Sequence, residues 1–310
     1  NIRINKNMDI NKSINTKTDT INENTKCDTN KKNKTDAKNT SDTENSMEFM
    51  SIELKDLILE TIKEVVPKSQ RPYTFSDEYI LENVCDLLKN LTKWRAIQRT
   101  QKNEKVNHYS TIFKRYRKWV DYDVFKIAYN KLLNKYIFPE INTKKTLELF
   151  IDGTLVNNKH GIDFIGHGEN AKKNNTKITV ICDFNKKNVY SVDFFKGNTS
   201  DVNTVEPLVE SLIDKINTRK INLVGDKGYI LGNEKNDKLK KINVNMHVPK
   251  RKNQKGKTGA ITKKHLRKRY IVEHCIQQVK TFDRIYTRKD SKLCNYKGFF
   301  YLALILKFKK

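Results

Sequence analysis

The segment Leu147-Glu-Leu-Phe-Ile-Asp-Gly153 consists of bulky apolar residues that run into an aspartate and a glycine. Such a run, bounded by turn residues, predicts a buried β-strand that ends at Asp152. A second segment of the same form, Ile221-Asn-Leu-Val-Gly-Asp226, predicts a strand that ends at Asp226. Aspartate is disfavoured inside strands and costly to bury, so two aspartates at strand ends are candidates for chemistry. Each is also an ordinary turn residue when taken alone, and that interpretation stays open.

The residues around these two segments alternate between strand and helix patterns. Three more strands are predicted, at residues 177–184, 189–195 and 244–248, the first two joined by a hairpin turn. Helices are expected at residues 201–216, 265–283 and 295–308. We expect Asp201 to act only as the N-terminal cap of the first of these helices. Together these patterns predict an α/β domain with a mixed sheet over residues 145–310.

A third acidic residue, Glu273, lies in the middle of the expected helix at 265–283. Arg269, Glu273, Gln277 and Lys280 follow one another at spacings of four, four and three, so they share one face of that helix. The face is also compatible with a solvated ladder of ion pairs. If it faces the two aspartates instead, three carboxylates converge, and they can hold two Mg²⁺ or Mn²⁺ ions for phosphodiester chemistry.

Residues 47–140 have a helical period throughout and contain a densely basic segment, His108 to Val120. Apolar residues of this segment alternate with four cations, Lys114, Arg115, Arg117 and Lys118. Several short helices with one basic member predict an all-helical, helix-turn-helix-like DNA-binding domain. The alternative is a helical bundle whose basic face is only solvated.

The composition points to a polyanionic partner. The 310 residues contain 62 Lys and Arg against 36 Asp and Glu, which gives a net charge of +26 and favours nucleic acid as the ligand. A second basic stretch, Lys250 to Lys264, predicts a phosphate-binding loop that includes Lys250 and Arg251. The longest apolar run, Gly298 to Leu306, is too short to cross a bilayer, so we expect no membrane partner.

The cysteines and the N-terminal residues indicate where the protein acts and where its folded part begins. Five widely spaced cysteines without a CxxC pair predict neither disulfides nor a zinc ribbon, which favours a reducing, intracellular location with DNA. Residues 1–46 are rich in Asn and Lys and lack an apolar period, so we expect a disordered tail. Because residue 1 is Asn, we expect the true start to be missing or to lie at Met47 or Met50.

Several short motifs, taken in order, resemble one known family. They are Trp94-Arg95, Ser110 to Trp119, Ile151-Asp-Gly-Thr154, Thr176-Lys-Ile178, Gly197-Asn-Thr-Ser-Asp201, Gly225-Asp-Lys-Gly-Tyr229, Arg269-x3-Glu273-x6-Lys280, Arg284 and Asn295-Tyr-x-Gly-Phe299. In this order and spacing the chain resembles the DDE transposases of bacterial insertion sequences, which have an RNase H-like catalytic core. The resemblance covers about two thirds of the chain, from Trp94 to the C-terminus.

The resemblance implies a function and a set of roles. Asp152, Asp226 and Glu273 would be the catalytic, metal-binding triad, and Arg269 and Lys280 would contact phosphates. The activity would be metal-dependent cleavage and transfer of DNA strands at terminal inverted repeats, by a possible homodimer on paired DNA ends. Two alternatives remain: a domesticated, catalytically inactive DNA-binding protein, and a simple metal-dependent nuclease.

Overall fold

The computed structural model describes residues 50–310, except residues 91, 98–107, 168–173, 217–219 and 251–258. The first part of the described chain is helical, as its periodicity predicted. Its elements are α1 (Ile52–Val65), α2 (Asp77–Lys89), the 3-10 turn η1 (Trp94–Ala96), α4 (Tyr109–Asp121), α5 (Val124–Tyr136) and α6 (Phe138–Asn142). Ser76 caps α2, because its hydroxyl accepts the N–H of Tyr79 at 3.2 Å. The predicted tail at residues 1–46 lies outside the described residues.

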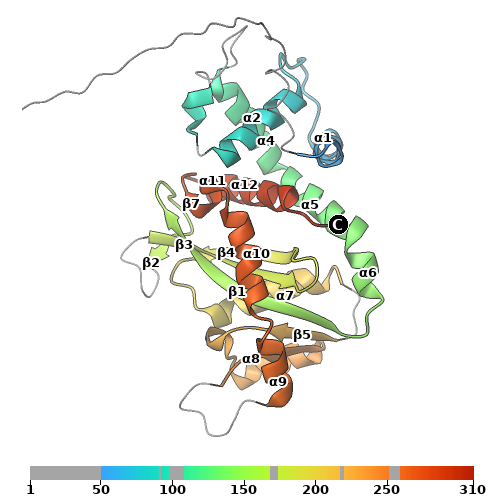
Figure 1. Ribbon diagram of the computed structural model, residues 1–310. Helices are drawn as coiled ribbons and strands as arrows, with labels where there is room; N and C mark the ends of the chain where they lie inside the picture. The colour runs from blue at the N-terminus through green and yellow to red at the C-terminus, as the bar shows by residue number, and fades with distance from the viewer. Residues whose placement is uncertain (1–49, 91, 98–107, 168–173, 217–219, 251–258) are drawn as a thin grey trace, which may run out of the picture. The chain divides into compact units, whose positions relative to one another are not determined.

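A mixed sheet follows the helices (Figure 1). Its strands are β1 (Leu147–Asn158), β2 (Gly166–His167), β3 (Asn174–Asp183), β4 (Val189–Lys196), β5 (Ile221–Val224), β6 (Val244–His247) and β7 (Thr287–Arg288). The main order is β2-β3-β1-β5-β6, and β4 pairs with β3 while β7 pairs with β1. β1, β3 and β4 are antiparallel neighbours, whereas β5 and β6 run parallel to β1 and to each other. The sheet with its helices confirms the predicted α/β class.

The remaining helical elements lie between and after the later strands. They are η2 (Asp201–Thr204), α7 (Val205–Ile213), η3 (Lys227–Tyr229), α8 (Asn233–Lys241), α9 (Ala260–Leu266), α10 (Tyr270–Lys280), α11 (Asp283–Tyr286) and α12 (Leu293–Leu306). Helix α10 packs against β1 and β3, and Figure 1 shows it running across the sheet. Helix α7 packs against β4 and β3.

The single helix predicted at 265–283 was wrong, because the chain breaks into α9, α10 and α11. The first break is a 3-10 turn, in which the N–H of Arg269 bonds to the carbonyl of Leu266. It coincides with an anchor to the sheet: the Glu148 carboxylate of β1 accepts hydrogen bonds from His265 and, at 2.7 Å, from Lys268. This anchor therefore fixes the point at which α10 starts its path over the sheet.

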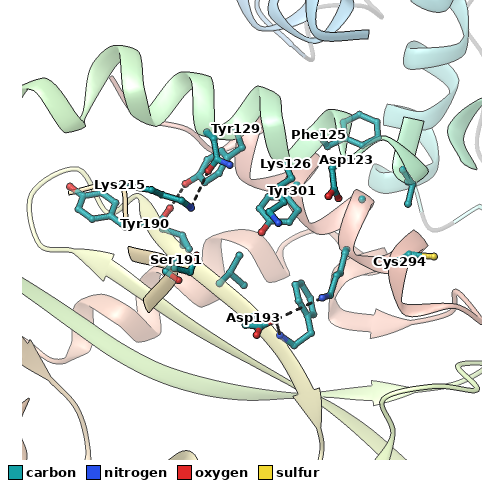
Figure 2. A pocket seen from close by; sticks show the side chains of 18 of the residues that line it. Asp123, Phe125, Lys126, Tyr129, Tyr190, Ser191, Asp193, Lys215, Cys294 and Tyr301 are labelled. Carbon is teal, nitrogen blue, oxygen red and sulfur yellow. Dashed lines mark hydrogen bonds and ion pairs between the residues drawn. The ribbon is translucent and has the colours of Figure 1, made fainter. Parts of the chain in front are cut away.

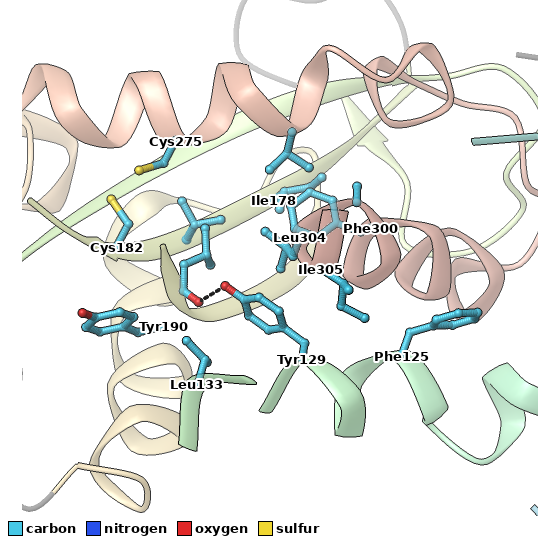
Figure 3. Close-up of a cluster of buried hydrophobic side chains, with 14 of the residues drawn as sticks. Phe125, Tyr129, Leu133, Ile178, Cys182, Tyr190, Cys275, Phe300, Leu304 and Ile305 are labelled. Carbon is cyan, nitrogen blue, oxygen red and sulfur yellow. Dashed lines mark hydrogen bonds between the residues drawn. The ribbon is translucent and has the colours of Figure 1, made fainter. Parts of the chain in front are cut away.

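The helices before residue 145 share a core with the sheet. Residues 47–310 form one compact unit, in which α5 packs along α12 and α4 also contacts α12. The buried hydroxyl of Tyr129 on α5 donates to the carbonyl of Val189 on β4 at 2.7 Å (Figure 3). Tyr116 on α4 likewise donates to the carbonyl of Asn295 on α12 at 2.5 Å. The helical region and the sheet are therefore joined by buried side chains.

The cysteines of the described residues are free thiols, and Cys85, Cys182 and Cys275 among them are buried. In Figure 3 the side chains of Cys182 on β3 and Cys275 on α10 point toward each other in the space between strand and helix. They act there as small apolar residues of the interface between α10 and the sheet. Within the part of the chain that the structure describes, no helix combines the length and apolarity that a membrane span requires.

Candidate active site

Asp152 lies on the central strand β1, at the point where β1 loses one neighbour. β1 pairs with β5 only from Leu147 to Phe150. Its pairing with β3 continues through Asp152, which lies opposite Val180, as far as Asn157. The prediction that the strand ends at Asp152 was therefore wrong, because antiparallel pairing with β3 keeps the backbone extended well beyond it. β5 has already ended beside Asp152, and the residues that follow β5 lie next to this part of β1. The Asp152 Oδ1 accepts the N–H of Gly153 at 2.8 Å.

Asp226 follows the end of β5, as the sequence predicted. It caps the turn η3, because its Oδ1 accepts the N–H of Gly228 at 2.7 Å. β5 is parallel to β1 and pairs with it directly, so the chain leaving β5 emerges beside the residues that follow Phe150 in β1. Parallel pairing therefore brings Asp226 into the neighbourhood of Asp152, and the two carboxylates interact electrostatically.

Glu273 occupies the first turn of α10, the helix that packs over β1 and β3. Its Oε1 lies 3.1 Å from Nη2 of Arg269, one helical turn earlier. Arg269 and Glu273 therefore lie on one helical face, as predicted, and form an ion pair. Both side chains remain partly accessible, with exposed fractions of 53% for Glu273 and 35% for Arg269, so either can still reach a ligand.

The pKa of Asp152 reports on the electrostatics of this region. It is raised from 3.8 to about 6, first by burial and then by the negative charges of Asp226 and Glu273, while the Gly153 N–H and Arg269 act in the opposite direction. Both other acidic residues thus act on Asp152. An oxygen-rich, negatively charged donor set of this kind fits a hard divalent cation such as Mg²⁺ or Mn²⁺.

The carboxylates of Asp152, Asp226 and Glu273 do not surround a single point. Within the described residues, no three His, Cys, Asp or Glu side chains form a group that could hold a metal ion. Local donors hold each carboxylate instead: backbone N–H groups bind the two aspartates and Arg269 binds Glu273. The convergence of Asp152, Asp226 and Glu273 at metal-bridging distance therefore stays a prediction.

Lys280 ends α10 close to β1. Its Nζ donates to the Thr154 Oγ1 at 2.5 Å and lies 3.4 Å from the Leu155 carbonyl oxygen. Burial lowers the pKa of this lysine. In the described residues its ammonium is in no ion pair, so a positive charge lies two residues along the strand from Asp152 and is available to an anion.

The predicted role of Asp201 as a helix cap was wrong. Asp201 does not cap its helix, because Ser200 occupies the N-cap position of η2 and no side-chain capping bond is formed. Its Oδ1 instead lies 2.8 Å from Nζ of Lys177 on β3. The only signal in the sequence was its place at the end of the motif Gly197-Asn-Thr-Ser-Asp201, which by itself assigns no role.

The basic helix predicted at 108–120 is α4, but the structure uses Arg115 internally. Only 7% of the Arg115 side chain is exposed; its guanidinium pairs with Asp77 at 3.0 Å, bonds the Phe75 carbonyl and lies over the ring of Tyr73. The expectation that Arg115 contacts DNA does not fit this burial. The charge pattern could not reveal it, because Asp77 and Tyr73 belong to another segment of the chain.

The other predicted cations differ in their accessibility. Arg117 bonds Asp121 and Asn295, and Lys118 bonds the Pro67 carbonyl oxygen at 2.8 Å. Lys114 is exposed and forms no ion pair with the residues described. Lys250 lies just after β6, and Arg251 lies outside the described residues.

A cavity of about 310 Å³ lies apart from the three acidic residues, between α5, β4, α7 and α12 (Figure 2). Its charged residues are Asp123, Lys126, Asp193, Lys215 and Lys297. Two of these form an ion pair, since Nζ of Lys297 lies 3.7 Å from Asp193. None of the predicted catalytic residues lines it, so the cavity is separate from the candidate active site.

Comparison with known proteins agrees with the sequence motifs. The family model described as "Transposase DDE domain" matches residues 143–306, a segment that contains Asp152, Asp226 and Glu273. No curated protein sequence matches the chain. A solved piggyBac transposase synaptic complex with hairpin DNA is similar at a TM-score of 0.43 and 12% identity, covering 84% of this chain and 72% of that chain.

Two further solved structures show weaker similarity. The Drosophila P element transposase strand transfer complex matches with a TM-score of 0.28 and 13% identity, over 64% of this chain and 46% of that chain. A pre-cleavage Mos1 transpososome matches with a TM-score of 0.25 and 11% identity, over 79% of this chain and 82% of that chain.

Proposed function

This chain belongs to the DDE transposase family, and we propose that it cuts DNA at the ends of a mobile element and joins the freed ends to new DNA. One observation carries the proposal: the matching family segment contains three acidic residues, Asp152, Asp226 and Glu273, that share one electrostatic neighbourhood. They come from a strand, a turn and a helix that pack together, so the fold itself brings them near one another. The same membership supports an RNase H-like catalytic core.

We propose that Asp152, Asp226 and Glu273 hold two Mg²⁺ or Mn²⁺ ions. Metal ions held there would supply activation of water or a 3′-hydroxyl and stabilisation of the leaving oxygen of a phosphodiester. The protein's own contribution is to hold the three carboxylates on rigid elements. The charges of Asp226 and Glu273 support the assignment, because both act on the partly buried carboxylate of Asp152 and negative charge of this kind favours a positively charged ligand.

Arg269 and Lys280 are proposed to hold the phosphates of the reacting strand. Arg269 uses one terminal nitrogen on Glu273, which leaves further N–H groups of its planar guanidinium for a phosphate. Lys280 is fixed by Thr154 and is partly desolvated, so its attraction for an anion is screened less than that of an exposed lysine. The two cations lie at opposite ends of α10, with Glu273 between them.

We propose that double-stranded DNA, including terminal inverted repeats, binds to the basic surfaces outside the carboxylate site. Lys114 on α4 is the accessible cation of the predicted helix-turn-helix-like region, with Arg117 and Lys118 beside it. Lys250 and Arg251 would contribute a second phosphate-binding segment near β6. A homodimer on two paired DNA ends is the assembly we propose.

The test compares Asp226→Asn with Asp237→Asn, a matched loss of one carboxylate on the exposed surface of α8. With Mg²⁺, the wild type and the control should nick DNA that carries the element's end, and Asp226→Asn should not. All three should bind that DNA with similar affinity, because phosphate binding and metal binding are separate contributions.

A pre-cut substrate with a free 3′-hydroxyl separates the remaining possibilities. Joined products identify a transposase, whereas nicks without joining identify a simple nuclease. DNA binding with neither product would identify a catalytically inactive DNA-binding protein. Metal-dependent cleavage that persists in Asp226→Asn would refute the proposed site.

A further inference from the structure

The carboxylate of Asp201 lies between the two glycines that follow the predicted catalytic aspartates. A Cβ atom added to Gly228 would lie 2.5 Å from Asp201 Oδ2 and 3.0 Å from Asp226 Oδ1. A Cβ atom added to Gly153 would lie 3.4 Å from Asp201 Oδ1. Asp201 therefore lies closely against Gly228, two residues after Asp226, and also near Gly153, the residue after Asp152.

Lys177 fixes Asp201 in this place. Its ammonium lies 2.8 Å from Asp201 Oδ1 and donates to the Thr199 carbonyl at 2.5 Å. Only 13% of the Lys177 side chain is exposed, and its backbone is paired in β3 opposite Leu155 of β1. The ion pair thus connects Asp201 to the central strands, and it also neutralises the carboxylate. Because its carboxylate is already bound by Lys177, we assign Asp201 a positioning role.

Tyr229 completes the contact from the side of Asp226. Its side chain is fully buried, and its hydroxyl would lie 3.2 Å from a Cβ atom on Gly153. Burial raises the pKa of Tyr229, and the charges of Asp201, Asp152 and Asp226 add to this effect. The turn η3 is therefore packed against β1 through Tyr229 on one side and against Asp201 through Gly228 on the other.

We propose that Asp201, held by Lys177, is a positioning residue that sets the separation between Asp152 and Asp226. The inference rests on the proposed function, because the separation between Asp152 and Asp226 matters for metal binding only if these two residues are metal ligands. It also explains Gly228 by the space that this glycine leaves, because a side chain at position 228 would occupy the volume of the Asp201 carboxylate. We call the Asp201 carboxylate the spacer. Its loss should lower the affinity for metal ions more than it lowers the free energy of unfolding.

Two kinds of variant test the proposal. Asp201→Ala removes the spacer, and Asp201→Asn keeps its shape while removing the charge that binds Lys177. Gly228→Ala displaces the spacer from the other side. Its matched control is Gly232→Ala, because a Cβ atom at Gly232 would meet nothing within 4 Å. Mn²⁺ affinity is measured on the full chain without DNA, and DNA nicking is measured against Mg²⁺ concentration.

We expect Asp201→Ala and Gly228→Ala to bind Mn²⁺ about tenfold more weakly, which corresponds to about 1.4 kcal/mol. Both should need about tenfold more Mg²⁺ for half-maximal nicking while keeping most of the rate at saturation. Asp201→Asn should lie between them and the wild type, and Gly232→Ala should match the wild type.

Unchanged Mn²⁺ affinity and Mg²⁺ dependence in Asp201→Ala or Asp201→Asn would overturn the proposal, whatever happens to the melting temperature. A wild type that binds Mn²⁺ but does not nick DNA would instead count against the proposed function. The comparison of Mn²⁺ affinities among the variants would still decide the role of Asp201.

Discussion

Replacing Asp152 by asparagine should stabilise the metal-free protein at alkaline pH, and the gain should shrink as the solution is acidified. A carboxyl group whose pKa is higher in the folded state than in the unfolded state favours folding only when it is protonated. The pKa of Asp152 rises from 3.8 to about 6, and one pKa unit corresponds to about 1.4 kcal/mol. The native charge therefore costs about 3 kcal/mol of unfolding free energy at pH 8, but only about 0.5 kcal/mol at pH 4.

Asparagine keeps the shape of the side chain and the Oδ1 that accepts the Gly153 N–H, so the substitution removes mainly the charge. Urea unfolding of the wild type and of Asp152→Asn, with EDTA present, gives both free energies from pH 4 to pH 8. Asp56→Asn is the control for charge removal itself, since Asp56 is exposed on α1. The difference between the two variants isolates the contribution of the site.

We expect the unfolding free energy of Asp152→Asn to exceed that of the wild type by about 3 kcal/mol at pH 8 and to approach the wild-type value at pH 4. Saturating Mg²⁺ at pH 8 should narrow the gap, because a bound cation stabilises only the protein that keeps all three carboxylates. A stability difference that stays flat with pH, or an asparagine variant that is less stable at pH 8, would refute the electrostatic description of Asp152.

The remaining predictions concern the basic helix and a buried ion pair. Lys114→Gln should lower the salt dependence of DNA binding by about one phosphate contact without changing the melting temperature; an unchanged slope would remove Lys114 from the interface. Arg115→Gln should lower the unfolding free energy by about 3 kcal/mol in urea titrations, and a neutral result would contradict its structural role. Arg284→Met should cost about 3–5 kcal/mol, because it leaves Asp290 buried and unpaired, and Asp290→Leu in the same chain should recover most of the loss; no recovery would mean that the pair is not the cause.

Local patterns in the sequence predicted the elements that carry the site. The apolar run before Asp226 became β5 and ended where expected, because a short parallel strand has its own apolar signature. The spacing of Arg269 and Glu273 placed them on one helical face, and the ion pair between them confirms it. Patterns of this kind depend only on neighbours along the chain, so they can be interpreted without knowledge of the tertiary structure.

The parts that could not be predicted depend on partners from distant segments. β1 continues past Asp152 because β3 pairs with it there, and nothing in residues 147–153 encodes that pairing. Arg115 has the same charge as its neighbours on α4, but its side chain is buried and pairs with Asp77. Charge pattern alone therefore cannot separate a cation that binds DNA from one that holds two helices together.

The two glycines show how one sequence signal can have two physical causes. An aspartate followed closely by glycine is an ordinary turn signal, and Asp226 does cap a turn whose Gly228 N–H it binds. The same Gly228 also leaves the space that Asp201 occupies, and Gly153 lies inside a continuous strand where no turn exists. A turn alone would tolerate a small side chain at position 228. What excludes that side chain is the Asp201 carboxylate, which lies where its Cβ atom would be. Gly228 is therefore better explained by the close approach of a third carboxylate from η2, which connects the turn after Asp226 to Lys177 and the central strands.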